Sequence, residues 1–312
     1  MLMSHRLFTP LLIGALLAVF ASPADAQRRR DRDRDRGDEV SRLDTTLALS
    51  RGGTVELEGA EGEMIVTGST GDHVRIRATS ERGELRIDAT SSRIHVQSLA
   101  MGWGDVRYEV SVPTGTRLLL SGQSADIQVR GTGGRVEART QNGDIEITGA
   151  TEVEVNALNG DIELQKVEGV RVNLVSGDVR IDSVRGTVEA QTVSGDIEVR
   201  NAVSREVRVQ TTSGNVFFDG TIDSGGRYEL ASHSGNVIVR VPADVSAAVS
   251  LQTYNGAIES DFPITLEGGA TMGGHPRSFD FRIGSGGARI TVQSFSGTIH
   301  LQRTGTQNRQ ED

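Results

Sequence analysis

The sequence predicts an all-β fold, a β-solenoid (parallel β-helix-like) whose coils of 17–21 residues each hold two short strands. Three observations lead to it. A short motif recurs at a nearly fixed period between about residues 122 and 301. Apolar and polar residues alternate on both sides of each motif. With 38 Gly, 6 Pro and 4% aromatic residues, the composition suits many short strands joined by tight turns. A fixed period of this kind is typical of stacked repeats.

The motif is a small polar residue, Gly, Asp or Asn, and then Ile or Val. Its copies begin at Asn142, Asn159, Ser176, Ser194, Ser213 and Ser234, and weaker copies begin at Asn255 and Ser296. Around Gly160, the run from 153 to 157 and the run from 162 to 165 each place apolar residues at every second position. Period-2 alternation indicates a strand with one buried face, so each coil contains two strands that meet at a Gly corner.

Two architectures fit this pattern, because Asn-Gly between alternating strands is also typical of a hairpin and would give an antiparallel meander. Equivalent positions favour the solenoid, since stacked coils would bring opposite charges and amides side by side. The charged ladders are Glu137, Glu154, Arg171, Glu189, Arg208, Glu229 and Glu146, Glu163, Arg180, Glu198; the amide ladder is Asn156, Asn173, Gln191, Gln210, Gln252, Gln293. The strands are too short for a transmembrane barrel, which needs about 9–11 residues per strand.

The N-terminal residues have the features of an export signal. His5 and Arg6 precede an apolar run at 11–20 and a small-x-small cleavage site at 24–26, so residues 1–26 are a predicted signal peptide. Residues 27–39 alternate Arg and Asp with no apolar residue and are a predicted disordered linker. We therefore expect an exported protein, periplasmic or on the cell surface, with no transmembrane segment in the mature chain.

The remaining chain forms one predicted repeat domain over residues 40–303. It divides into looser coils and a cap at 40–121, regular coils at 122–260, an excursion loop at 261–287 and a last coil at 288–303, followed by a polar tail at 304–312. No Cys is present, so neither a disulfide nor a lipid-modified Cys contributes. A net charge of −9 argues against nucleic acid as a partner.

Taken together, these segments resemble a known family. The repeated Ser/Asn-Gly-Asp units, the Val-Pro turns at 110–115 and 239–245, and the ending at 283–290 with its final Ser-Gly-Thr-Ile are similar to the DUF4097 family of β-strand-repeat candidate adhesins. The resemblance implies an exported, non-enzymatic β-helical protein without a cofactor or an established catalytic site. Separately, a long, rigid surface with no assembled catalytic set favours a partner in the cell envelope, whether an envelope polymer, a polysaccharide or an envelope protein.

A column of acidic residues at the corners is the sharpest candidate for a metal site. It comprises Asp126, Asp144, Asp161, Asp178 and Asp196 and continues as Asn215 and Asn236. Oxygen ligands repeated between coils could hold Ca²⁺. The alternative, which we favour, is that these side chains accept hydrogen bonds from backbone N–H groups of the turns. Ala257 and Thr298 interrupt the column in the last two copies.

Departures from the repeat are the candidate binding residues. Phe217, Phe218 and Ile238 break the polar outward pattern and could form an apolar strip, either packed under the 261–287 excursion or used for a partner. Met272, His275 and Arg277 mark the excursion, and loops on rigid scaffolds often carry recognition. Trp103 could stack on a sugar, although an anchoring role in a loop is favoured.

The alternative function is a polysaccharide-acting enzyme, a lyase or a hydrolase. Paired carboxylates on an outer face carry glycoside chemistry, and Glu146 with Glu163, or Glu137 with Glu154, would lie at ladder spacing. The regular alternation of Glu with Arg favours charge neutralisation instead. No residue is therefore assigned a catalytic role, and no metal or cofactor is assigned.

Overall fold

The computed structural model describes residues 40–99, 104–263 and 277–304. The predicted signal peptide and linker, Trp103, Met272 and His275 lie outside the described residues. The described residues form 22 strands. No helix long and apolar enough to cross a membrane occurs among them.

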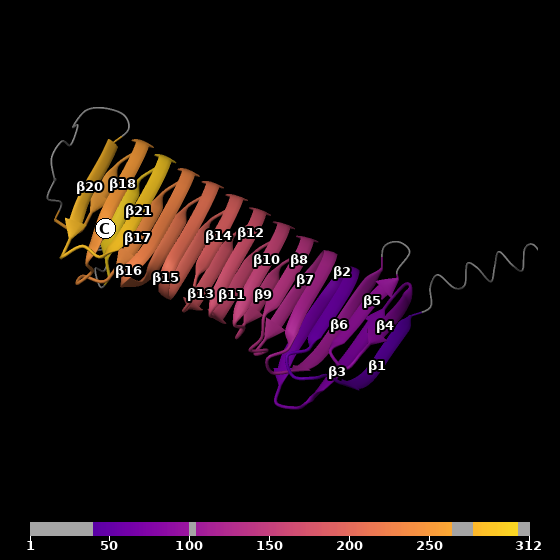
Figure 1. Ribbon diagram of the computed structural model, residues 1–312. Coiled ribbons are helices and arrows are strands. Elements are labelled where there is room, and N and C mark those ends of the chain that lie inside the picture. Colours follow the sequence, from indigo (N-terminus) through magenta and orange to yellow (C-terminus); the bar gives the residue numbers. More distant parts are fainter. Residues whose placement is uncertain (1–39, 100–103, 264–276, 305–312) are drawn as a thin grey trace, which may run out of the picture. The chain divides into compact units, whose positions relative to one another are not determined.

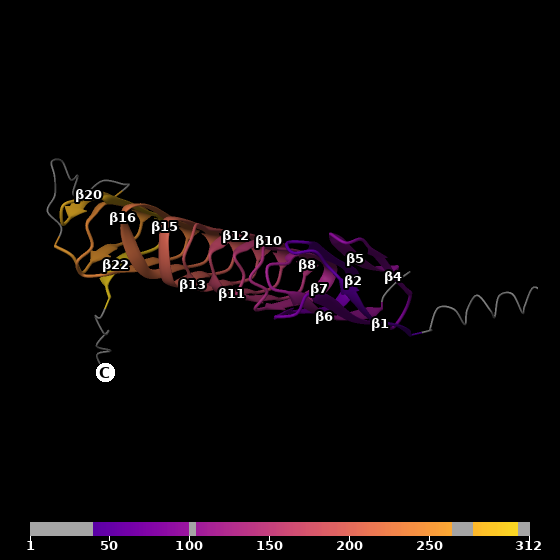
Figure 2. The same ribbon diagram turned by 60° about the horizontal axis from the view of Figure 1, so that its bottom comes forward.

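The strands form two layers with the core between them (Figures 1 and 2). We call the layers face A and face B. Face A holds, in stacking order, β4 (Glu84–Ala89), β5 (Arg93–Leu99), the first parts of β2 (Thr54–Ser69) and β7 (Arg117–Arg130), β8 (Val136–Asn142), β10 (Glu152–Asn159), β12 (Gly169–Ser176), β14 (Val188–Ser194), the second parts of β15 (Ile197–Ser213) and β16 (Val216–Ser234), β21 (Ala288–Ser296), β18 (Ala247–Asn255) and β20 (Arg277–Ile283).

Face B follows the same order of coils. It holds β1 (Ser41–Ala48), β3 (His73–Ser80), β6 (Asp105–Pro113), the second parts of β2 and β7, β9 (Ile145–Thr148), β11 (Ile162–Val167), β13 (Val179–Val184), the first parts of β15 and β16, β17 (Val237–Val241), β22 (Ile299–Arg303) and β19 (Ile258–Ser260). The pairs are parallel except near the ends of the stack, where β1–β3, β3–β6, β4–β5 and β18–β20 are antiparallel.

The pairing register confirms the predicted solenoid and excludes the meander. Glu154 pairs with Arg171 and Arg171 with Glu189, each one coil further along the stack. Asn156 pairs with Asn173 in the same register, as the amide ladder predicts. Equivalent positions therefore stack directly on one another, because each period of the sequence is one coil.

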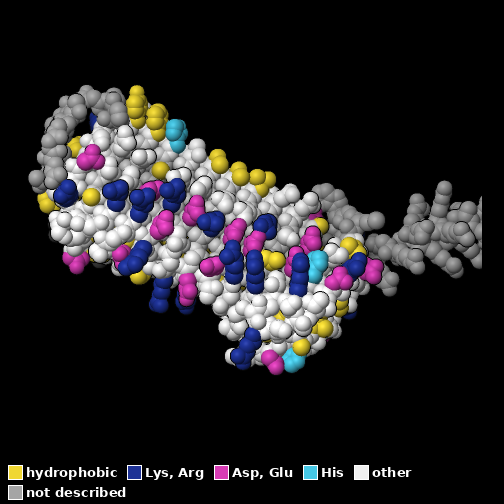
Figure 3. Space-filling model, viewed as in Figure 1, with side chains coloured by type: hydrophobic (Ala, Val, Ile, Leu, Met, Phe, Trp, Pro, Cys, Tyr) yellow, Lys and Arg dark blue, Asp and Glu magenta, His cyan; other side chains and the backbone are white. Residues whose placement is uncertain are grey.

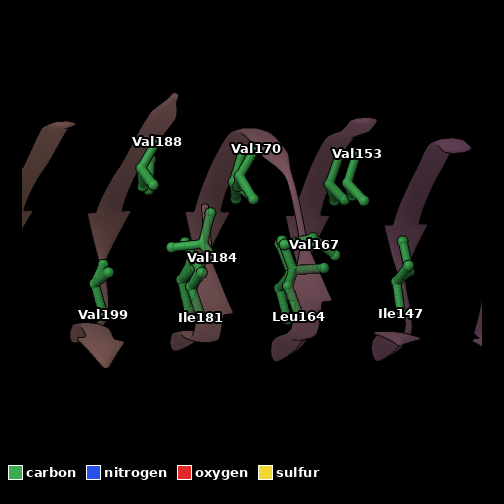
Figure 4. Packing of buried hydrophobic residues seen from close by; sticks show 14 of the residues in the cluster. Ile147, Val153, Leu164, Val167, Val170, Ile181, Val184, Val188 and Val199 are labelled. Atoms are coloured by element: carbon green, nitrogen blue, oxygen red, sulfur yellow. The ribbon is translucent and has the colours of Figure 1, made fainter. Parts of the chain in front are cut away.

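The core is built from the inward-facing residue of each alternating pair. Val153, Leu164, Val170, Ile181 and Val188 lie in neighbouring coils with exposures of 0–5%, and they contact one another between the two faces (Figure 4). Burying one such side chain stabilises the fold by roughly 1.5–3 kcal/mol, so the repeated coils add their contributions along the stack.

Glycine is required at each corner for two reasons. The corner glycines other than Gly256 have positive φ, for example +127° at Gly143 and +140° at Gly195. A Cβ at Gly195 would also lie 1.9 Å from the carbonyl oxygen of Gly177 in the preceding coil. The corners of successive coils therefore approach so closely that only hydrogen fits between them.

At both ends, stacking order departs from sequence order. The coil of β21 and β22 is the last in the sequence, yet it lies between the coil of β16 and β17 and the coil of β18 and β19. The coil of β2 likewise lies between β5 and β6 on one side and β7 on the other. The segment predicted as an excursion loop contains a strand, β20, which pairs antiparallel with β18 at the end of face A. Nothing in the periodic pattern signals these insertions, because the repeats look alike wherever they stack.

Candidate functional site

Three columns of side chains cover the outside of face A, at fixed positions before each corner Gly. The residues six positions before the Gly form an ionic column, and the residues four positions before it form an amide column. In stacking order, the amide column consists of Asn156, Asn173, Gln191, Gln210, Ala231, Gln293 and Gln252. Two residues before the Gly lies a column that we call the ridge, which reads Leu158, Val175, Val193, Thr212, His233, Phe295, Tyr254.

The ridge is an exposed, mostly apolar line of side chains. Leu158, Val175, Val193, Phe295 and Tyr254 expose 41–48% of their surface. In Figure 3, hydrophobic side chains and a histidine follow the upper edge of the view, above the band of Lys, Arg, Asp and Glu. Strand alternation turns this column outward while the apolar residues beside it fill the core. Aligned apolar residues of this kind mark a contact surface more strongly than scattered ones do.

Aromatic rings form the last part of the ridge. His233 stacks on Phe295 with ring centroids 4.7 Å apart and planes 9° apart. Phe295 stacks on Tyr254 at 5.0 Å and 5°. Because β21 is inserted between β16 and β18, Phe295 lies between the other two rings. The order of these residues in the sequence differs from their order in the stack, so the ladder of rings is not evident from the sequence.

A groove of about 650 Å³ runs between the amide column and the ridge. No Asp, Glu, Lys or Arg is among the described residues that line it, in contrast to the ionic column beside it. Its floor includes Thr192, Thr211, Ser232 and Ser294, which are buried. The hydroxyl of Ser232 donates to the corner carbonyl of Gly214 at 2.7 Å, and that of Ser294 donates to Gly235 at 3.0 Å. The floor is therefore held in place by the corners and is preformed.

The amides along the groove are largely free to bind. Asn173 donates to Asn156 at 3.0 Å, as expected for an amide ladder. Among the described residues, no side chain or backbone group hydrogen-bonds to the amides of Gln191, Gln210, Gln293 or Gln252. Each of these amides offers both donors and an acceptor at the groove wall.

The acidic corner column ties neighbouring coils together. The Asp126 carboxylate accepts a hydrogen bond from the backbone N–H of Asp144 at 2.9 Å. Each following carboxylate or amide oxygen does the same for the next coil. The acceptor distances are 2.8 Å for Asp144, 2.9 Å for Asp161, 2.9 Å for Asp178, 2.7 Å for Asp196, 2.9 Å for Asn215 and 2.8 Å for Asn236. The bonds thus cross between coils rather than closing a single turn. No group of three or more His, Cys, Asp or Glu side chains placed to hold a metal ion occurs in the described part of the chain.

The prediction of an outward apolar strip among Phe217, Phe218 and Ile238 is wrong for Phe218. Phe218 is fully buried and belongs to the core, because the strand alternation continues through Phe217 and turns Phe218 inward. Phe217 pairs with Ile238 on face B and lies between two guanidinium groups, that of Arg200 at 5.1 Å and that of Arg240 at 5.2 Å from its ring centroid.

The described part of the excursion lies on the other face. Strand β20 pairs with β18 on face A, whereas Phe217 and Ile238 lie on face B. Arg277, the first residue of β20, donates to the carbonyl of Gly256 at 3.0 Å.

The Glu pairs proposed as catalytic candidates do lie side by side, since Glu137 pairs with Glu154 and Glu146 with Glu163. Each of the four is engaged by a neighbour. The Glu137 carboxylate contacts Arg139, and Glu154 accepts from Arg135 at 3.1 Å. Glu146 accepts from Gln128 at 2.7 Å, and Glu163 from Gln165 at 2.6 Å. The four carboxylates therefore already have hydrogen-bond partners along the face.

The groove is not among the sites predicted from the sequence. Its signal lies two residues before each corner Gly, where apolar or aromatic residues stand at a position that should be polar on an outward face. The ionic and amide columns are each recognisable from their residue types, whereas this third column mixes residue types and its ring ladder depends on the inserted coil.

A family model, Toastrack DUF4097, matches residues 41–302. No curated protein matches the chain. Two crystal structures are among the solved structures that resemble the chain. A putative cell adhesion protein from Clostridium sporogenes has 7% identity and a TM-score of 0.25 over 85% of this chain and 100% of that chain. A putative adhesin from Parabacteroides merdae has 10% identity and a TM-score of 0.33 over 84% of this chain and 96% of that chain. Because the family model spans nearly all of the repeat coils, the chain belongs to the Toastrack DUF4097 family.

Proposed function

We propose that the protein is an exported, non-enzymatic binding module that holds an extended partner of the cell envelope along face A. The single observation that carries the proposal is the preformed groove between the ridge and the amide column. Binding sites are concave and combine apolar surface with a few placed polar groups, and this groove has both. Its repetition from coil to coil suits a partner that is itself long.

Export and a place in the envelope rest on the predicted signal peptide at 1–26. Two sources of partner fit a long groove at that location, an envelope polymer or an envelope protein.

The enzymatic alternative receives less support. A general acid must have its proton free to donate to the leaving group, and an activated carboxylate must reach its substrate. Glu137, Glu146, Glu154 and Glu163 instead contact Arg or Gln side chains of the same face. The Arg contacts of Glu137, Glu154 and Glu146 support a role in neutralising stacked like charges.

The test is a sedimentation assay of the mature chain with isolated cell-envelope fractions. Val193 lies in the groove wall with 48% exposure, and Val203 is an exposed Val outside the groove, at 55%. Val193→Lys should weaken binding at least tenfold, because it places a charge in an uncharged groove. Val203→Lys is the matched control and should bind as the unaltered chain does. Equal binding by all three proteins would show that the groove is not the binding surface.

A further inference from the structure

The groove has a definite repeat along the stack. The stacked rings of the ridge are 4.7 and 5.0 Å apart, and the amide column advances with the same coils. A linear ligand lying in the groove therefore meets one new ridge side chain at each coil and one new amide at each coil from β12 to β18 except that of β16, which carries Ala231. Its own repeat must match that step if every unit is to bind in the same way.

An extended peptide does not match the step. It advances by roughly 3.3 Å per residue, so its side chains fall out of phase with coils about 4.8 Å apart. An extended β-1,4-linked sugar chain advances by about one coil spacing per sugar. Each sugar would therefore occupy an equivalent place in the groove.

The uncharged lining of the groove narrows the class of ligand further. The described lining includes Gln191, Gln210 and Gln293, the hydroxyls of the floor and the ridge, but no carboxylate, guanidinium or ammonium group. A carboxylate or sulfate moved into such a groove would lose hydration without gaining a counter-charge. An uncharged ligand avoids that cost.

The two walls match the two surfaces of a pyranose ring. Its C–H face is apolar and fits the ridge at Val193, Thr212 and Phe295, while its equatorial hydroxyls both donate and accept hydrogen bonds. The amides of Gln191 and Gln210 offer the same pair of functions and have no protein partner among the described residues. The preformed floor reduces the ordering cost of binding.

We infer that the groove binds an extended, uncharged β-1,4-linked polysaccharide that runs along the stack across β12, β14, β15, β16, β21 and β18. This inference rests on the proposed function and names the ligand class of the same groove.

The experiment is isothermal titration of the mature full chain with cellohexaose and chitohexaose, with polygalacturonate as the charged comparison. At least one hexasaccharide should bind, and polygalacturonate should bind at least tenfold more weakly. The double variant Gln210→Leu with Gln293→Leu replaces both amides by apolar side chains of similar volume and removes their hydrogen-bonding groups, so the dissociation constant should rise about tenfold or more.

The control is Gln128→Leu with Gln165→Leu on face B, which removes two amides outside the groove and should leave binding unchanged. An equal loss in both double variants would overturn the inference, as would preferential binding of polygalacturonate. If neither hexasaccharide binds while envelope binding still depends on Val193, the ligand class is wrong and the proposed function stands. If envelope binding does not depend on Val193 either, both fail.

Discussion

The middle of the stack and its two ends are built from the same coil but assembled differently. From β8 to β15, each coil contacts the coil that precedes it and the coil that follows it in the sequence. At the C-terminal end, β21 and β22 enter between coils that came earlier, and at the N-terminal end β2 lies between β7 and the pair β5 and β6. Middle coils depend on local stacking, whereas end coils also depend on pairing between distant segments.

The contrast between middle and ends indicates how the terminal coils of an open repeat array can be stabilised. Terminal segments normally fray because they have a neighbour on one side only. Here the segment nearest the C-terminus has paired strands on both sides, and antiparallel strands close face A at β20 and β4. The inserted coil also builds the ring ladder of the ridge, so the same insertion contributes to stability and to the candidate site.

The largest effect should come from a corner in the middle. Gly195→Val combines a φ of +140° with a Cβ that would lie 1.9 Å from a backbone carbonyl oxygen. We expect a loss of about 4 kcal/mol or more in the free energy of unfolding, measured by urea titration. Gly115→Ala is the control from the N-terminal end. Its φ is +87° but nothing lies within 4 Å of its Cβ, so only about 1–2 kcal/mol should be lost. Similar losses in the two variants would contradict the close approach of the corners.

The next largest effect should come from substitutions in the core, which compare the inserted coil with a coil in the middle of the stack. Leu301→Ala in β22 and Leu164→Ala in β11 each empty a fully buried position and should each cost about 2–5 kcal/mol. Amide hydrogen exchange should also show stronger protection in β22 than in β19, although β22 is closer to the C-terminus. Rapid exchange throughout β22, with a negligible cost for Leu301→Ala, would mean that the inserted coil is frayed.

A smaller effect is expected for the hydrogen bonds between corners. Asp178→Ala removes the acceptor for the backbone N–H of Asp196 and should cost about 0.5–1.5 kcal/mol. Asp178→Asn should be within about 0.5 kcal/mol of the unaltered chain, since Asn215 and Asn236 already play this role. Thermal unfolding of the Asp178→Ala and Asp178→Asn variants measures the two losses of stability. An equal loss for Asn and Ala would indicate that the carboxylate charge matters, as a bound cation would require.

The smallest effect is a gain at the C-terminal end, where the corner column stops. The backbone N–H of Thr298 donates to the Oδ1 of Asn236 at 2.8 Å, and the next corner in the stack carries Ala257. Thr298→Asn would supply an acceptor for the backbone N–H of Ala257 and should raise the free energy of unfolding by up to about 1 kcal/mol. Differential scanning calorimetry of this variant, with Thr298→Val as the control without an acceptor, measures the gain. No difference between Asn and Val would show that the column does not extend to the last coil.

Much of the architecture was predictable because the repeat carries it locally. The Gly corners, the alternation around Gly160 and the ladder from Glu137 to Glu229 specified coils, strands and register, and the structure agrees with them. The candidate site was less accessible. Phe218 is one of three residues that break the expected outward pattern in the sequence, yet its strand turns it inward, and the members of the ridge are not distinctive one at a time.

Local sequence is enough to specify the coil: its length, its corner and the inward or outward direction of nearly every side chain follow from a period of two and from glycine at positive φ. The order in which the coils stack follows instead from long-range packing. Parallel coils with equivalent edges can pair in more than one order, and the choice depends on contacts between segments far apart in the chain. That choice places Phe295 between His233 and Tyr254, and so it completes the ridge of the groove.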